Sequence, residues 1–532
     1  MIKLCTVAEI RTAERAALSD ARTEDDLMTS AATGIAGLIL QRYGDRIGTA
    51  LFLVGPGKNG GDGLVTATIL IEVGWTCYVW GFKRDGRGNA PISDLAADRL
   101  NWVDDPSEIQ KVMERADLIV DAVFGIGGKI DLPRDVAQVF ASAREVRVAR
   151  GTPLWAVDLP SGVDADTGDA AEPAFHADVT VSIGLPKVGL YRVPALRFAG
   201  DVELVDIGLS APEATAEDVA LIDEGSVRRL MPRRRQDTHK HDVGWLMVIG
   251  GAPNYYGAPR MAAEAAARAG AGMVCLAVPR SLVAPIASAV REVTFLPLPE
   301  AEFGGAGERM AQLVANRLPD FSACLVGPGL GQDEPVPEFL SRLFGLRSGS
   351  QSIGFGSAPT SSQSEAFSGR AVIDADGLNF LANQEAWHEA LSTAKLVLTP
   401  HPGELGRLTD KSTSEILADP WNAARAAAER FQQVVVLKQG FPVVAAPGAP
   451  LLIAPRCDPA LASAGTGDVL AGTIAGLMAQ GLEARDAAAV GLFIGSRAAD
   501  LAEKRVGTLS LVAGDVIDAL PQAICQLYDR EW

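Results

Sequence analysis

The residues best suited to chemistry form a short glycine-rich stretch near the end of the chain, Gly465-Thr466-Gly467-Asp468. A helix is expected to follow directly, at 468–480. Backbone N–H groups at the start of a helix, with the positive end of its dipole, bind anions. A carboxylate there can take the proton of a hydroxyl group that attacks a phosphate. Alternatively, Asp468 only caps the helix, and these four residues alone favour that simpler interpretation.

Polar groups also follow other apolar, strand-like runs in the second half of the chain. The stretches at 327–331, 374–379 and 399–404 each stand directly after such a run. Because ligands bind at the carboxyl ends of parallel strands, these groups are expected to form one site. His401 is held between two prolines, so ligand contact is favoured over a purely structural role. Lys438-Gln439-Gly440, after another strand, either holds a nucleotide phosphate or is an ordinary strand end.

The first half has its own glycine-rich stretch, Gly55-Pro56-Gly57-Lys58-Asn59-Gly60-Gly61-Asp62-Gly63. Its beginning fits the G-x-G-x-x-G pattern of Rossmann nucleotide sites, which also expects an acidic residue at the end of the next strand. That strand, expected at 77–82, ends without one, and the next carboxylate is Asp85. The part at 59–63 is more specific, because it places an amide and a carboxylate among glycines that let a ligand approach the backbone. The alternative is a tight turn capped by Asp62.

Two later strand ends carry further carboxylates. Asp121 precedes a glycine-containing run, and Asp158 stands in Val157-Asp158-Leu159-Pro160-Ser161-Gly162. In a doubly wound sheet these ends are expected to converge with Asn59. Amide, carboxylate and hydroxyl oxygens suit an alkali or alkaline-earth cation better than zinc. Asp158 or Asp62 could serve as a base there.

Alternating strands and helices are expected to position these stretches. Helical spacing is present at 6–17 and 24–40. Strands are predicted at 49–54, 77–82, 118–124, 154–159, 179–183 and 202–207, and again at 245–249, 273–278, 323–326, 371–373, 396–398 and 434–437. Helical runs separate many of them, which predicts an α/β protein with parallel, doubly wound sheets.

The length, net charge and cysteine content of the chain limit the class of protein it can be. A chain of 532 residues is expected to form two domains, with a junction at 210–237. The net charge of −18 argues against binding to nucleic acid or an anionic membrane. The six cysteines include no C-x-x-C pair, and the chain has no signal-like start and no spanning segment. We therefore expect a cytoplasmic protein without membrane or nucleic-acid partners, forming a homo-oligomer.

Residues 6–209 resemble the NAD(P)H-hydrate epimerase family, which has the Rossmann-like YjeF N-terminal fold. The matching stretches are 57–63, 121–125 and 157–162. The resemblance implies interconversion of the R and S forms at C6 of the hydrated nicotinamide ring, with Asp158 as a catalytic residue. It implies a potassium ion bound by Asn59, Asp121 and Ser161. Hydrate contacts are implied for Lys58, Asn59, Gly60, Gly61, Asp62, Gly125, Ile126, Gly127, Gly128, Lys129, Ile130, Asp131 and Asp158. Lys58 replaces an asparagine that is usual in the family.

Residues 238–520 look like a ribokinase-like fold and resemble the ADP-dependent NAD(P)H-hydrate dehydratase family. The resemblance implies that ADP phosphorylates the ring hydroxyl of the S hydrate; loss of phosphate then restores NADH or NADPH and leaves AMP. Asp468 would take the hydroxyl proton, and magnesium is expected with the phosphates. Hydrate contacts are implied for Ala258, Gly329, His401 and Asp468, and nucleotide contacts for Lys438, Gln439, Gly440, Phe441, Pro442 and Gly467. The stretch at 438–442 lacks the glycine and threonine usual in that family.

Together these features predict a bifunctional repair enzyme for hydrated NADH and NADPH. Its epimerase domain is expected at 1–225 and its dehydratase domain at 226–532. One alternative is a ribokinase-like kinase for a small molecule such as a vitamin precursor. Another is that the first domain only binds a ligand or a partner protein.

Overall fold

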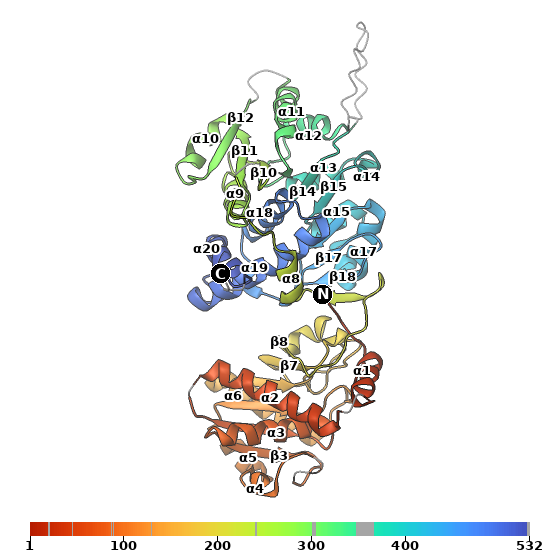
Figure 1. Ribbon diagram of the computed structural model, residues 1–532, viewed down its shortest axis with the longest axis vertical. Helices are drawn as coiled ribbons and strands as arrows, with labels where there is room; N and C mark the ends of the chain where they lie inside the picture. Colours follow the sequence, from red (N-terminus) through yellow and green to blue (C-terminus); the bar gives the residue numbers. More distant parts are fainter. Residues whose placement is uncertain are drawn as a thin grey trace. The chain divides into compact units, whose positions relative to one another are not determined.

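The structure, a computed structural model (Figure 1), describes residues 1–19, 22–44, 46–86, 88, 90–128, 130–239, 242–300, 305–346 and 366–528. The chain divides into two compact units. One comprises Ile2–Ala214, and the other comprises Thr215–Trp532 together with Met1. Both are built from strands and helices that alternate along the chain, as predicted.

The N-terminal unit is organised around a parallel sheet of seven strands in the order β4-β3-β2-β5-β6-β7-β8. The strands are β2 (Thr49–Val54), β3 (Thr76–Gly81), β4 (Asn101–Trp102), β5 (Leu118–Ala122), β6 (Leu154–Val157), β7 (Val179–Ile183) and β8 (Asp201–Val205), and the short β1 (Ile2–Lys3) precedes them. The central strands are buried along their length because both faces of the sheet are covered. The strand order reverses between β2 and β5, where an open α/β sheet forms its ligand-binding crevice.

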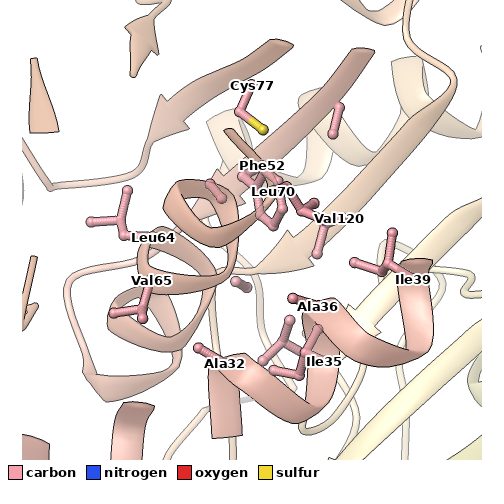
Figure 2. Close-up of a cluster of buried hydrophobic side chains, with 14 of the residues drawn as sticks. Ala32, Ile35, Ala36, Ile39, Phe52, Leu64, Val65, Leu70, Cys77 and Val120 are labelled. Atoms are coloured by element: carbon pink, nitrogen blue, oxygen red, sulfur yellow. The ribbon is translucent and has the colours of Figure 1, made fainter. Parts of the chain in front are cut away.

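Helices cover both faces of this sheet. They are α1 (Val7–Ser19), α2 (Glu24–Tyr43), α3 (Lys58–Glu72), α4 (Asp94–Ala97), α5 (Pro106–Met113), α6 (Arg134–Arg150) and α7 (Leu196–Ala199), with the 3₁₀ turn η1 (Val188–Tyr191). Alternate residues of β2 divide between two cores. Phe52 packs with α2 and α3, as Figure 2 shows, whereas Leu51 and Leu53 pack with α5 and α6. The period of two in the strand therefore places one helical layer on each face.

The C-terminal unit contains a larger, mixed sheet, which runs β9-β18-β17-β16-β15-β14-β13-β10-β11-β12. The strands are β9 (Val219–Leu221), β10 (Trp245–Ile249), β11 (Met273–Pro279), β12 (Val293–Leu298), β13 (Ala323–Val326), β14 (Arg370–Ile373), β15 (Lys395–Leu398), β16 (Val434–Leu437), β17 (Val443–Ala445) and β18 (Leu451–Ile453). The expectation of a parallel sheet holds from β16 to β12. It is wrong at β17, which pairs antiparallel with both β16 and β18, because only a short turn connects these strands.

Helices surround this sheet as well. They are α8 (Glu224–Leu230), α9 (Gly257–Arg268), α10 (Arg280–Ala287), α11 (Ala306–Arg317), α12 (Val336–Phe344), α13 (Asp376–Ala382), α14 (Trp387–Ala390), α15 (Pro402–Thr409), α16 (Thr413–Ala418), α17 (Pro420–Phe431), α18 (Thr466–Ala479), α19 (Ala484–Val506) and α20 (Ala513–Cys525), with 3₁₀ turns η2 (Leu318–Asp320) and η3 (Pro459–Leu461). Helix α18 packs on β13 and β14 and lies closely against α9. A methyl group on Gly472 would lie 2.1 Å from the Ala262 carbonyl oxygen, so glycine permits this close packing.

One further expectation needs correction. Helix α3 begins at Lys58, so the glycines at 60, 61 and 63 lie in its first turns rather than in a loop. Their missing side chains let the helix start close to the sheet: a methyl group on Gly63 would meet the Ala122 side chain at 2.6 Å. The boundary between the two units falls between Ala214 and Thr215, inside the range 210–237 expected for the junction, and β9 and α8 of that range belong to the C-terminal unit. Across the described ranges, no helix is both long and apolar enough to cross a membrane.

Candidate active sites

The N-terminal unit has a pocket of about 470 Å³ at the carboxyl ends of its strands. The loops after β2, β5 and β6 form one side, and α1 and α2 form the other. Among the lining residues are Lys58, Asn59, Asp62, Gly125, Ile126, Gly127, Gly128 and Asp158. The structure therefore brings together three of the strand ends singled out in the sequence.

Close backbone approach shapes this pocket. A methyl group on Gly60 would lie 2.0 Å from the Gly55 carbonyl oxygen, which only glycine allows. One on Gly125 would lie 3.0 Å from Asp158 Oδ2 and 3.3 Å from Asn59 Cγ. Glycine at position 125 therefore leaves just enough room for the side chains of Asp158 and Asn59. The N-terminus of α3 faces the same pocket, which favours an anionic ligand group.

Asp158 is held in a strained and specific position. Its φ of +68° lies in the left-handed region, which a non-glycine residue adopts at some cost. Its Oδ1 lies 2.5 Å from the ammonium group of Lys187 and accepts a 3.3 Å hydrogen bond from the Ile183 N–H. Asp158 is thus fixed by contacts from the last residue of β7 and from the segment that follows it.

Two more acidic side chains share the pocket. Burial raises the pKa of Asp62 well above its ordinary value, and the carboxylates of Asp158 and Glu14 raise it further. Burial also raises the pKa of Glu14. Lys58, which also lines the pocket, forms an exposed ion pair with Glu24 at 2.8 Å. The pocket therefore combines groups that can hold protons with one fixed carboxylate.

Of the residues expected to bind a cation, Asn59 lines this pocket, while Asp121 and Ser161 hydrogen-bond to the lining residues Val123 and Phe124. Asp121 is fully buried and accepts hydrogen bonds from the Ser161 hydroxyl (2.8 Å), the Ser161 N–H (2.7 Å) and the Val123 N–H (3.0 Å). Burial raises the pKa of Asp121 to about 7 against these hydrogen bonds. Asn59 is buried, and neither of its side-chain polar atoms has a hydrogen-bond partner. A buried, unpartnered amide oxygen is a ligand of the kind that a potassium ion accepts, and the oxygens of Asp121 and Ser161 are of the same hard type.

The remaining predicted residues of this half lie at different depths. Gly60 and Gly61 are buried in α3 behind the pocket surface. Ile130 and Asp131 follow the lining run at 125–128 without lining the pocket themselves. Lys129 lies outside the described residues.

In the C-terminal unit, α18 begins in a way that leaves Asp468 free of a capping role. Gly465 occupies the N-cap position with φ +90°, and Asp468 lies in the first turn. The Thr466 hydroxyl donates to the Leu461 (2.8 Å) and Ser463 (2.9 Å) carbonyls, which holds the turn. The interpretation of Asp468 as a helix cap is therefore wrong, because Gly465 occupies the N-cap position and Asp468 is already the third residue of the helix.

The neighbours of Asp468 come from other strand ends. Burial, followed by the carboxylates Asp374 and Asp376, raises the pKa of Asp468 to about 7, although Lys438 opposes this. Lys438 itself pairs with Asp374 at 2.7 Å, and Asp374 also accepts from the Thr399 hydroxyl at 2.8 Å. A carboxyl group that titrates near neutrality beside a lysine can exchange a proton with a ligand hydroxyl.

His401 has a structural role at the start of α15. Its Nδ1 accepts from the N–H groups of Gly403 (3.0 Å) and Glu404 (3.3 Å), while the Glu404 carboxylate accepts from the His401 N–H (2.8 Å). Burial, helped by Lys438 and Arg407, lowers the pKa of His401. The neutral ring must therefore carry its proton on Nε2, which leaves a donor for a ligand.

A cavity of about 370 Å³ adjoins the start of α18. The expected nucleotide residues Lys438, Gln439, Gly440, Pro442 and Gly467 line it, whereas Phe441 is buried and does not. The far side contains Arg456, Cys457, Asp458 and Ser496, which the motifs did not indicate. Asp458 accepts a 2.6 Å hydrogen bond from the Ser496 hydroxyl.

Ala258 and Gly329 also lie together. A methyl group on Gly329, whose φ is +59°, would lie 3.2 Å from the Ala258 side chain and 2.5 Å from the Tyr255 carbonyl oxygen. Asp376 holds the loop that contains Gly329 by accepting from the Gly331 N–H at 2.8 Å. The first turn of α9 and the loop after β13 thus meet at one edge of the sheet.

Sequence reasoning missed Lys187 and Glu14, which line the N-terminal pocket. Glu14 belongs to a helix with ordinary amphipathic spacing. A lysine in the uncharged run Ser-Ile-Gly-Leu-Pro-Lys-Val-Gly-Leu, which begins at Ser182, is the one signal that could have identified Lys187, because lysines are almost never fully buried without a partner.

Comparison with known proteins agrees with the division of the chain into two units. Residues 24–189 match the family model "YjeF-related protein N-terminus", and residues 246–522 match the model "NAD(P)H-hydrate dehydratase". The bifunctional NAD(P)H-hydrate repair enzyme Nnr of Moorella thermoacetica is 33% identical, covering 99% of this chain and 97% of its own length. Its counterpart in Salinibacter ruber is 35% identical over 94% of this chain and 92% of that protein.

Among solved structures, the ADP/ATP-dependent NAD(P)H-hydrate dehydratase of Bacillus subtilis, co-crystallised with ATP and Mg²⁺, aligns with a TM-score of 0.45 and 23% identity. That alignment covers 58% of this chain and 98% of that one. The two family models, and relatives aligned along almost the whole chain, identify the fused architecture. The chain therefore belongs to the family of bifunctional NAD(P)H-hydrate repair enzymes, in which an epimerase and a dehydratase are fused.

Proposed function

We propose that this chain repairs hydrated NADH and NADPH in two steps. The N-terminal unit interconverts the R and S hydrates. The C-terminal unit uses ADP to convert the S hydrate to NADH or NADPH, with AMP and phosphate as the other products. The expected domains at 1–225 and 226–532 remain our assignment of the two activities. The observation that carries the proposal is that each unit gathers its predicted reactive carboxylate with the other strand-end groups.

In the N-terminal unit, we assign Asp158 as the group that exchanges a proton with the hydrate. Its carboxylate is fixed at the pocket, and the N-terminus of α3 would receive a phosphate of the dinucleotide. Asn59, Asp121 and Ser161 would hold a potassium ion, which would supply positive charge to an oxygen of the ligand. The buried, unpartnered amide of Asn59 supports this assignment.

In the C-terminal unit, we assign Asp468 as the base for the ring hydroxyl. The N–H groups at the start of α18 would stabilise charge on the transferred phosphoryl group, and Lys438 would add a cation beside it. Phosphorylation is useful here because hydroxide is a poor leaving group, whereas phosphate is a good one. Ala258, Gly329 and His401 would contact the hydrate, and the 370 Å³ cavity would hold the nucleotide.

Magnesium would arrive with the nucleotide phosphates. Within the described ranges, no group of three or more His, Cys, Asp or Glu side chains is placed to hold a metal ion. We also infer a cytoplasmic location from the cysteines, four of which are buried free thiols. A homo-oligomer without nucleic-acid or membrane partners completes the assignment.

The deciding experiment supplies the protein with mixed R and S hydrate and follows NADH absorbance. With ADP and Mg²⁺, we expect full recovery, beyond the spontaneous epimerisation measured without protein. Recovery of the S fraction alone would contradict the epimerase assignment. A small-molecule kinase is not favoured, since the relatives aligned along the chain are repair enzymes; ATP-dependent phosphorylation of a stable alcohol without hydrate turnover would reverse this conclusion.

A further inference from the structure

Lys187 is a buried cation in the N-terminal pocket. Its side chain is 1% exposed, although it follows directly after Pro186 in a connecting segment between β7 and η1. Burying an ammonium group costs several kcal/mol unless a partner compensates its charge. An uncharged residue could fill this position without the free-energy cost of burying a charge. The burial of Lys187 therefore indicates a specific partner for its ammonium group.

The backbone around Lys187 is anchored on both sides. The Cys5 N–H donates to the Pro186 carbonyl at 2.8 Å, and the Val188 N–H donates to the Cys5 carbonyl at 3.1 Å. The ammonium group donates to the Ile183 carbonyl at 2.6 Å and faces Asp158 Oδ1 at 2.5 Å. Lys187 is therefore a fixed cation rather than a mobile one.

The two oxygens of Asp158 have different surroundings. Oδ1 is occupied by Lys187 and by the Ile183 N–H. Oδ2 is the oxygen nearest to Gly125, where only a missing side chain leaves room. Lys187 thus leaves Oδ2 as the oxygen on the side of the Gly125 loop.

Other charged groups face the same space. Glu14 and Arg11 come from α1, while Lys58 and Asp62 come from the start of α3. The pKa values of Glu14 and Asp62 are both raised, chiefly by burial. Without Lys187, the Asp158 carboxylate would stand near the carboxyl groups of Asp62 and Glu14 with no buried lysine beside it.

We propose that Lys187 is a positioning residue for epimerisation: it pairs with Oδ1 of Asp158 and so directs Oδ2 toward the hydrate. This inference rests on the proposed epimerase function of the N-terminal unit. Lys187 itself need not touch the hydrate, because its effect acts through the Asp158 carboxylate.

The test follows R-to-S conversion of purified R hydrate by chromatography without nucleotide, so that dehydration is silent. In Lys187→Met we expect the rate to fall about 100-fold or more. The acidic limb of its pH–rate profile should move to higher pH, because the charge that favours the carboxylate is gone. Lys187→Arg should retain the wild-type acidic limb and recover part of the rate.

Lys111→Met is the matched control, since Lys111 is an exposed lysine of α5 in the same unit. Dehydration of S hydrate with ADP by each variant checks the rest of the chain, and thermal melting checks folding. An unchanged rate and pH profile in folded Lys187→Met would overturn the proposal. If Lys187→Met does not fold, the test rests on Lys187→Arg. A shifted acidic limb in the pH–rate profile of Lys187→Arg would then overturn the proposal. Absence of epimerisation by the wild-type protein would instead refute the proposed function.

Discussion

The Lys438 ammonium group lies 2.7 Å from Asp374 Oδ1, which joins the carboxyl ends of β16 and β14 across the intervening β15. Burial by itself lowers the pKa of Lys438, but the carboxylates of Asp374 and Glu404 outweigh burial and raise it. A methyl group on Gly467 would lie 3.4 Å from the same ammonium group. One lysine thus connects a buried acidic cluster with the glycine loop before Asp468.

Replacing Lys438 by methionine should weaken nucleotide binding. The loss of one charge-assisted contact corresponds to about 10- to 100-fold in Kd, or roughly 1.5–3 kcal/mol. Titration calorimetry with ADP measures the change in Kd. The variant loses the partner of buried Asp374 and is expected to be less stable, so the measurement is made well below its unfolding temperature. Lys395→Met removes an exposed lysine paired with Glu483 and serves as the control. Equal affinities in all three proteins would refute a phosphate contact for Lys438.

Asp468→Asn should abolish dehydration while leaving nucleotide bound. Asparagine has nearly the same shape but cannot accept the hydroxyl proton, so turnover should fall about 10²- to 10⁴-fold. The measurement is NADH formation from S hydrate and ADP, with the Kd of ADP measured in parallel. R-to-S conversion by the same variant provides an internal control from the other unit. Turnover within a factor of about two of wild type would rule out the base role.

Dehydration should depend on pH through Asp468. Because burial raises the pKa of Asp468 to about 7, kcat/KM should rise with pH and reach half its maximum near pH 7. Stability should change in the opposite direction. The folded protein holds this proton more tightly than the unfolded chain, so stability falls as pH rises from about 4 to about 7. Asp468→Asn should therefore melt higher than wild type at pH 8 and lose this advantage at pH 4. A constant melting difference would contradict the shift.

Asn59→Leu should remove potassium binding without destabilising the protein in its absence. The side-chain polar atoms of Asn59 are buried without protein partners, so leucine gives up no internal hydrogen bond. Potassium should raise the melting temperature of the wild-type N-terminal unit, because a ligand that binds the folded state stabilises it. Melting in KCl against choline chloride at equal ionic strength measures this effect. A potassium shift of the same size in Asn59→Leu would exclude Asn59 as a ligand.

Much of the architecture was predictable because local physics sets it. The strands predicted at 49–54 and 179–183 match β2 and β7 residue for residue. Short apolar runs bounded by turn residues are typical of buried strands. The six-residue hydrophobic strand β12 was missed, because its burial is only partial and its apolar residues follow no strict alternation. The short strands β17 and β18 were also missed, and with them the antiparallel edge of the C-terminal sheet.

The sequence by itself determined the two α/β units and placed reactive carboxylates at a strand end, Asp158, and at a helix start, Asp468. It could do so because parallel strands present their carboxyl ends at one edge of a sheet. Only the tertiary structure decided which of these groups have partners. It paired Asp158 with Lys187, left the amide of Asn59 unpartnered, and gave the cap of α18 to Gly465 rather than Asp468. Pairing and burial depend on side chains that meet across the fold, and their electrostatic consequences follow from that meeting rather than from spacing along the chain.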